Sequence, residues 1–195
     1  MNLTDTTYVQ AVEFQLEGFQ SLVFDAPDLP VSAYIFDGTS RVSGWTPPAV
    51  YSPYPRRRKP DLWHLFGVSG IVIPADLTMN LEPFLSKAGE LLPLKSDDGD
   101  FLLLNILEDI NCLDSLGSDL KAIPPRLSFV EHRLDETGLF KVPETDTADI
   151  YHVEREDDED SFRKRIATLG LIGLRFETVW TSRQGPIERT IEWFK

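Results

Sequence analysis

The sequence is poor in the residues from which metal sites and covalent cross-links are built. Its 195 residues include one cysteine, Cys112, and three histidines, His64, His132 and His152. A single cysteine excludes an intramolecular disulfide and a cysteine-rich zinc site. No two histidines lie three or four residues apart, and no H-E-x-x-H motif is present, so the usual helical zinc ligands are missing. We therefore expect neither a metal nor a cofactor.

Long apolar segments are also missing. No uninterrupted apolar run approaches the length of about 18 residues that spans a bilayer as a helix. The first residues, MNLTDTTYVQAVEFQ, lack the basic and apolar regions of a secretory signal. The lone cysteine is typical of a reducing compartment. These features predict a cytoplasmic protein with no membrane partner.

Basic residues are scarce relative to acidic ones. The chain has 19 Lys and Arg against 32 Asp and Glu, which gives a net charge of −13. Such a surface repels nucleic-acid phosphates and anionic lipid headgroups. It attracts a basic protein, for example a nuclease, although acidity also serves solubility alone. The charge argues against nucleic-acid binding and leaves the identity of a protein partner open.

Motifs of nucleophilic and phosphate chemistry are missing as well. The chain has no G-x-S-x-G, no G-x-G-x-x-G and no G-x-x-x-x-G-K-[ST]. Cys112 lies in the segment DFLLLNILEDINCLD after an apolar run, with no histidine nearby in sequence. A buried thiol is the commonest outcome for such a cysteine. The alternative is a small hydrolase whose site forms from residues distant in sequence, with Cys112 or His132 as its reactive group.

The apolar residues that are present recur mostly with the period of β-strands. Val12, Phe14 and Leu16 alternate with polar residues, which predicts a half-buried strand. Further strands are predicted in the segments SLVF, SAYIF, GIVI, FLLLNIL, INCLD, LSFVEHRL, GLFKV, DIYHVE and LRFETVW. The continuous run FLLLNIL is typical of a central strand that is covered on both faces.

Two segments have helical spacing instead. Apolar residues over 75–88 favour a helix that begins late or kinks, because Pro83 lies inside the pattern. A second helix is predicted where Phe162, Ile166 and Leu169 follow the acidic run EREDDED, with Gly170 as its end. The chain thus predicts an α+β fold, with a largely antiparallel sheet of many short strands and two or three helices, in one domain over 1–195.

A long proline-rich loop is predicted over 37–60. Proline fixes φ and lacks an amide donor, so the five prolines at positions 47 to 60 disfavour regular structure. The loop carries RRRK at 56–59, the longest run of basic residues in the chain. We interpret this cluster as a solvated loop or as a charge latch onto the acidic surface of the protein itself, ahead of a nucleic-acid contact.

One family resemblance adds to these patterns. The segments FDG, PDLW, GELLPL, FLLLNILEDINCLD, GLFKV and LGLIGLRFETVW occur in this order. Together they resemble a bacterial family, immunity protein family eleven, earlier a domain of unknown function. The likeness covers 36–180, is most specific around Asn105 and over 170–176, and leaves 1–35 outside it. The resemblance implies a non-catalytic protein that binds and neutralises a cognate toxin domain of a polymorphic toxin system. It implies no catalytic residues.

If the chain binds such a partner, two surfaces are candidates. Trp45, Tyr51 and Tyr54 lie near the arginines of the proline-rich loop, and this composition is typical of interface hot spots. Alternatively, Trp45 and Trp63 pack the loop onto its own core, which we favour for Trp63. A self-associating structural module is a third possible function, and the oligomeric state is open.

The acidic run at 154–160 is the second candidate surface. The residues proposed to contact a toxin there are Glu154, Glu156, Asp157 and Asp158. The structural alternative is that these acids stabilise the positive N-terminal end of the helix that follows.

Overall fold

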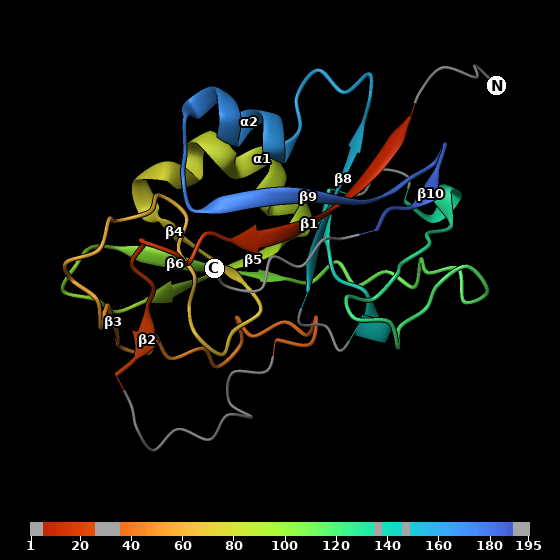
Figure 1. The fold of residues 1–195 in the computed structure, drawn as a ribbon. Helices are drawn as coiled ribbons and strands as arrows, with labels where there is room; N and C mark the ends of the chain where they lie inside the picture. The colour runs from red at the N-terminus through yellow and green to blue at the C-terminus, as the bar shows by residue number, and fades with distance from the viewer. Residues whose placement is uncertain (1–5, 26–35, 135–137, 146–148, 189–195) are drawn as a thin grey trace.

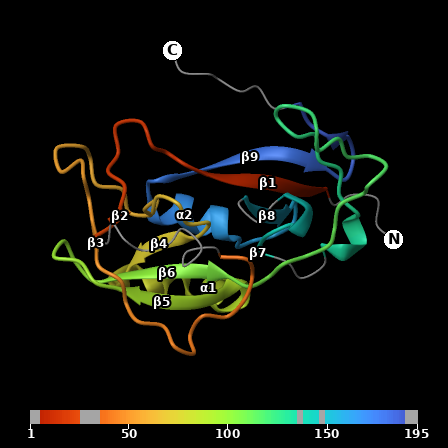
Figure 2. The same ribbon diagram turned by 90° about the horizontal axis from the view of Figure 1, so that it is seen from below.

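The computed structural model describes residues 6–25, 36–134, 138–145 and 149–188 (Figure 1). The fold is α+β, with antiparallel sheets of short strands and two α-helices, as the sequence predicts. Figure 2 shows the largest sheet and a three-stranded sheet on opposite sides of the molecule, with α2 visible between them. No helix among the described residues has the length and apolarity needed to cross a membrane.

The largest sheet is fully antiparallel and is built around the N-terminal strand. Its order is β10–β9–β1–β8–β7. The strands are β1 (Thr7–Phe14), β7 (Leu139–Phe140), β8 (Ile150–Arg155), β9 (Leu174–Thr181) and β10 (Gly185–Pro186). Val9 in β1 lies opposite Val153 in β8 and Trp180 in β9. The first strand begins and ends earlier in the chain than its apolar alternation predicts. Leu16 lies beyond the strand, and its side chain is 43% exposed.

The three-stranded sheet contains the apolar run that the sequence predicts as a central strand. Its members are β4 (Ile71–Pro74), β5 (Gly89–Leu94) and β6 (Phe101–Ile106). β6 lies in the middle, antiparallel to both neighbours. Leu103 and Leu104 are both fully buried but belong to different apolar clusters. Successive side chains of a strand point to opposite faces, so a continuous apolar run fits a strand covered on both sides.

Both predicted helices are present and pack on each other. A 3₁₀ turn, η2 (Ala75–Leu77), leads into α1 (Thr78–Ala88), which accommodates Pro83 inside it. Helix α2 (Phe162–Leu169) ends at Gly170, whose φ of 66° is the left-handed conformation expected of a C-terminal glycine. The Phe84 and Phe162 rings of the two helices lie 6.1 Å apart. The cap of α2 is Ser161, whose hydroxyl accepts from Lys164 N at 3.2 Å, and no acidic residue lies in the first turn.

The remaining segments are irregular or nearly so. The proline-rich loop contains only β3 (Val50–Tyr51), which pairs with β2 (Val23–Phe24). The strands predicted at INCLD and LSFVEHRL are wrong: they form a single bridge between Leu113 and Phe129 and the 3₁₀ turn η3 (Glu131–Arg133). A further 3₁₀ turn is η4 (Pro143–Thr145). The predicted strand SAYIF lies outside the described residues apart from its last residue.

Candidate functional site

Cys112 belongs to the core. Its side chain is fully buried among apolar residues that include Phe129 and Phe140. Burial and the nearby Glu144 carboxylate raise the pKa of the Cys112 thiol to about 12. A thiol, unlike a thiolate, is a poor nucleophile, and at neutral pH this group is protonated. The prediction of a buried cysteine is confirmed.

Asn105, at the end of the same apolar run, clamps the start of the proline-rich loop. Its buried Nδ2 donates to Thr39 O at 3.0 Å and to Glu90 Oε1 at 2.8 Å. Glu90 also accepts from Ser40 Oγ at 2.7 Å and from Arg41 N at 2.5 Å. Burial alone would raise the pKa of Glu90, but these donors hold it below its ordinary value. The amide is therefore a structural clamp between β5, β6 and the loop.

The histidines do not converge. His152 in β8 is buried, and its Nδ1 lies 3.1 Å from Gln10 Oε1. Burial lowers the pKa of His152 to about 4. His64 lies between the rings of Phe14 and Phe66, and burial lowers its pKa as well. Within the described part of the chain, no group of three or more His, Cys, Asp and Glu side chains is placed to hold a metal ion.

The proline-rich loop is irregular but firmly attached. The buried Gln20 side chain donates from Nε2 to Pro55 O at 3.2 Å and to Arg57 O at 2.8 Å. The backbone of Arg58 donates to Gly18 O at 3.1 Å and accepts from Gln20 N at 2.9 Å. These bonds hold the basic end of the loop against the segment that follows β1.

The tryptophans anchor the loop rather than project from it. Trp63 is 2% exposed and meets Phe101 edge-on, with ring centroids 5.4 Å apart, so its predicted packing role is confirmed. Trp45 donates from Nε1 to Pro93 O at 2.8 Å and packs on Phe36 at 6.3 Å. We therefore assign Trp45 to the attachment of the loop.

The two tyrosines of the loop point outward. Tyr51 is 46% exposed and Tyr54 is 42% exposed. The Arg57 guanidinium lies 4.2 Å from the centroid of the Tyr54 ring. A hollow of about 310 Å³, lined by residues 53–57, lies at this point. We call Tyr51, Tyr54, Arg56 and Arg57 the aromatic–arginine face.

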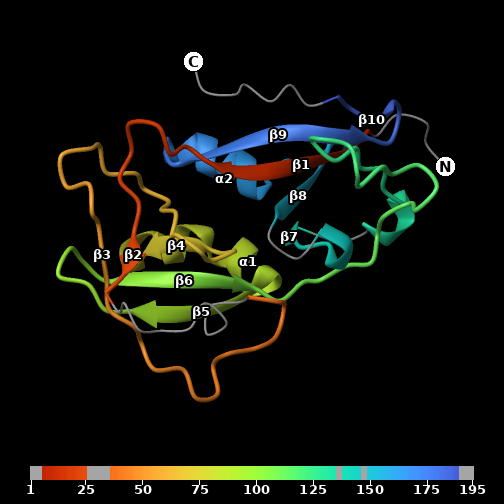
Figure 3. The same ribbon diagram turned by 60° about the horizontal axis from the view of Figure 1, so that its bottom comes forward.

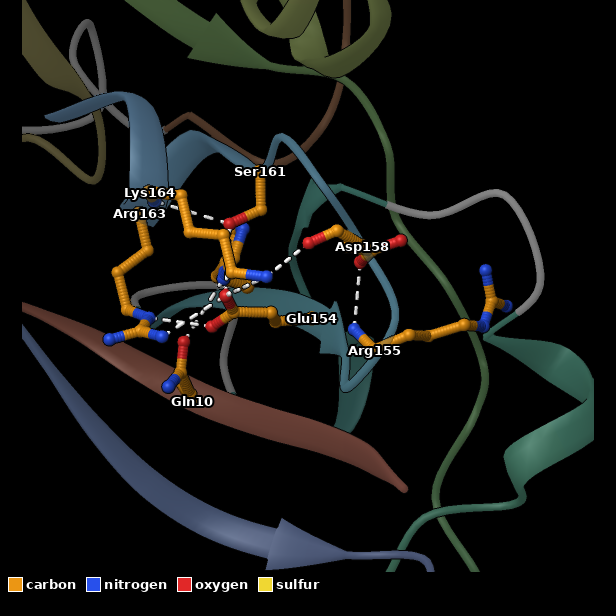
Figure 4. A network of polar contacts seen from close by, with 8 residues as sticks. Gln10, Glu154, Arg155, Asp158, Ser161, Arg163 and Lys164 are labelled. Atoms are coloured by element: carbon orange, nitrogen blue, oxygen red, sulfur yellow. Dashed lines mark hydrogen bonds and ion pairs between the residues drawn. The ribbon is translucent and has the colours of Figure 1, made fainter. Parts of the chain in front are cut away.

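Most acids of the run at 154–160 are bound by other groups of the protein itself (Figure 4). Glu154 is 3% exposed and binds Arg163 through Nε at 2.5 Å and Nη2 at 3.0 Å. Ser161 Oγ also donates a hydrogen bond to the Glu154 carboxylate at 3.2 Å. Burial alone would raise the pKa of Glu154, but Arg163 holds it below its ordinary value. Glu154 thus positions α2 and is not accessible to a partner.

Other acids of this run are also engaged. Asp158 accepts from Arg155 N at 2.7 Å through its carboxylate, and its carbonyl accepts from Lys164 Nζ. Asp160 pairs with Arg165, and Glu156 lies 3.5 Å from Arg183 Nη2. Among the described acids of this run, Asp157 and Glu159 are the exposed ones that form no salt bridge. Most acids of this run are therefore engaged within the protein, by basic side chains such as Arg163 and Arg165 rather than by the N-terminal end of α2 itself.

A hollow that the sequence did not indicate is lined in part by Lys59. It has a volume of about 360 Å³ and apolar walls that include Pro60, Trp63 and Phe101. Three aspartates line it, Asp76 in η2 and Asp98 and Asp100 in the turn between β5 and β6. Lys59 Nζ lies 3.7 Å from Asp98 Oδ1, an ion pair of the kind expected for a charge latch. We call this site the aspartate hollow.

Another hollow lies at the opposite end of the molecule. It has a volume of about 830 Å³ and is lined by parts of 111–121 together with Val130, Arg133 and Glu144. On the same loops, Leu116 is 97% exposed and Ile123 is 83% exposed. Figures 1 and 3 place these green loops away from β2 and β3. The two ends can therefore be altered independently.

No family model matches the chain, and no curated protein matches it in sequence. The resemblance to immunity protein family eleven therefore stands on the quoted motifs alone.

Proposed function

We propose that this chain is a non-catalytic immunity protein that binds and neutralises a cognate bacterial toxin domain. The observation that carries the proposal is the aromatic–arginine face, which combines exposed Tyr51 and Tyr54 with Arg57 on a loop fastened by Gln20. Tyrosine and arginine dominate interface hot spots. A surface that is ordered before binding loses less conformational entropy when it binds. The family resemblance supplies the class of partner.

The net charge of −13 supports a basic toxin. Opposite charge accelerates the encounter of two proteins and improves discrimination more than it adds affinity. The acids near α2 contribute little to specific contacts, because Arg163, Lys164 and Arg165 already neutralise several of them. The long-range attraction nevertheless acts through the total charge of the molecule.

The competing function is a small hydrolase. It draws no support from Cys112, because the thiol is buried and burial raises its pKa to about 12. His132 lies on η3, exposed to solvent, and remains its other candidate residue. Alanine at each position separates the functions, since a stoichiometric inhibitor needs neither reactive group.

The proposal is tested by co-expression. The probe is the C-terminal domain of the large protein encoded beside this gene, expressed in a naive host with and without the chain. We expect the domain to kill, the chain to restore survival, and the pair to co-purify at equal stoichiometry. Equal killing with and without the chain would overturn the proposal for that toxin.

Two variants serve as controls for catalysis. Cys112→Ala and His132→Ala should restore survival as the wild type does. If either variant folds but fails to protect, the result supports the hydrolase and overturns the non-catalytic function. Sedimentation of the free chain at several concentrations tests self-association, the third function.

A further inference from the structure

We propose that the aspartate hollow receives a lysine or arginine side chain of the bound toxin domain, where Lys59 pairs with Asp98 in the free protein. This inference rests on the proposed function and names a specificity site within it. It adds Asp76, Asp98 and Asp100 to the interface, three residues that lie outside the surfaces indicated by the sequence.

The charge of the hollow is not balanced from within. Three aspartates and one basic residue, Lys59, are among its lining residues, and Lys59 Nζ lies 3.7 Å from Asp98 Oδ1. In the part of the chain that the structure describes, Asp76 and Asp100 form no salt bridge. Bringing a partner's cation to this site therefore adds attraction that the folded chain does not already have. The run at 154–160 differs, because α2 supplies its bases.

The walls of the hollow suit the stem of a long basic side chain. Pro60, Pro74, Trp63 and Phe101 line the hollow together with the three aspartates. Lysine and arginine pack their aliphatic stems on apolar surface and keep the charged head near polar groups. A lining that combines acidic and apolar residues is complementary to such a side chain, and it disfavours an acidic or a short polar one.

The present occupant is easily displaced. The Lys59 and Asp98 side chains are 59% and 42% exposed, and exposed ion pairs contribute little to stability. An arginine from a partner would offer a planar fork of five N–H donors, which can engage two carboxylates at once. Exchange of Lys59 for such a group therefore gains contacts at little cost.

The hollow and the aromatic–arginine face are carried by neighbouring residues of the same loop. Lys59 and Pro60 line the hollow and follow directly after Arg56 and Arg57 in the same loop. Backbone bonds from Lys95 N to Pro48 O and from Val50 N to Lys95 O, at 2.9 and 2.8 Å, join the loop to the turn that carries Asp98. One partner that covers the tyrosines therefore also reaches the hollow, which is why we assign the occupant to the toxin.

The first test compares two triple variants with the same change of charge. One removes the carboxylates of the hollow, with Asp76→Asn, Asp98→Asn and Asp100→Asn. The other, the matched control, is Glu156→Gln, Asp157→Asn and Glu159→Gln. All six side chains are exposed, so the fold should persist, which circular dichroism checks. By calorimetry against the purified toxin domain, we expect the first to weaken Kd at least about tenfold and the control less than about threefold.

The second test removes the internal occupant. Lys59→Ala should bind the toxin domain more tightly than the wild type, by about threefold. Lys121→Ala, which removes one exposed lysine at the opposite end, should leave Kd unchanged. Equal effects of the two triple variants, or no gain from Lys59→Ala over Lys121→Ala, would overturn the inference.

Failure of the proposed function is distinguishable from failure of the hollow. If the wild-type chain does not bind the toxin domain, the proposed function falls first. N-acetyl-arginine amide, titrated at millimolar concentration in a two-dimensional NMR spectrum, then probes the hollow alone. Shifts of the Lys59, Asp76 and Asp98 amides that vanish in the aspartate triple variant support a cation site. Their absence rejects it.

Discussion

The two acidic regions of this protein differ in how their charges are balanced. The run at 154–160 is obvious in the sequence, yet Glu154 and Asp160 are bound by Arg163 and Arg165, which follow them by 9 and 5 positions in the chain. The aspartate hollow gathers three acids from two segments and opposes them with Lys59 alone. Density of charge along the chain is therefore a poor guide to charge that remains available to a partner. Acids followed closely by bases tend to organise the fold.

The two regions should differ most in how strongly they make the free energy of unfolding depend on acidic pH. His152 has a folded-state pKa of about 4, lowered by burial from 6.5, with Glu154 and Arg163 as its charged neighbours. The unfolded chain therefore binds the proton more readily, and stability is lost as the pH falls from 6.5 towards 4. A shift of this size corresponds to about 3 kcal/mol in the free energy of unfolding.

The measurement is urea unfolding between pH 4 and 7. His152→Gln, which does not titrate, should flatten this part of the profile once its own stability offset is subtracted. The aspartate triple variant of the hollow should retain the wild-type slope. An unchanged slope in His152→Gln would remove His152 as the cause.

Truncation of a buried acid should have the next largest effect. Glu154→Ala deprives Arg163 and Ser161 of their acceptor, and loss of a buried charged partner costs about 2 kcal/mol when the other charge can still reach water. Asp98→Ala, at the exposed hollow, should change stability by less than about 0.5 kcal/mol. Thermal or urea unfolding of both variants measures the difference, and equal losses would contradict the distinction.

A smaller effect, on binding alone, is expected at the tyrosines. Tyr54→Ala removes the ring on which Arg57 stacks and should weaken toxin binding about tenfold, or about 1.4 kcal/mol. Leu116→Ala, at the other end of the molecule, is the control because its side chain is 97% exposed. Calorimetry should show a change only for Tyr54→Ala. The reverse result would move the interface to the larger hollow.

The smallest effect concerns the latch. Lys59→Met should lower the free energy of unfolding by less than about 0.5 kcal/mol, because the pair with Asp98 is exposed at 3.7 Å. Denaturant midpoints of the wild type and the variant check this value. A loss of several kcal/mol would mean that Lys59 is a structural residue and cannot leave the hollow.

Periodicity predicted the elements whose apolar residues repeat along a strand or helix. β6, β8, β9 and the end of α2 at Gly170 belong to this group. It failed over 107–130, where Leu113 and Phe129 are buried in loops joined by isolated bridges. An apolar residue in a well-packed loop has the same local signature as one in a strand.

The candidate sites likewise divide into those whose residues are neighbours in the sequence and those whose residues only the fold brings together. Tyr54 and the acidic run are visible in the sequence because their members are neighbours along the chain. Asp76 and Asp98 are separated from Lys59 by 17 and 39 positions, and only the pairing of β4 and β5 with β6 brings them together. The KSDDGD segment carried no signal beyond that of a turn.

The hydrogen bonds that Gln20 donates to the proline-rich loop also determine whether a protease can cleave the native protein there. Three arginines and a lysine in succession would be the first target of trypsin in an unfolded chain, yet proteases require a segment that can detach from the body. Here Arg57 O is held by Gln20 Nε2, and Arg58 bonds through both its amide and its carbonyl. The buried Gln20 side chain thus helps to protect the segment at 56–59 from cleavage. Gln20→Ala should make trypsin cleave the native protein at this segment.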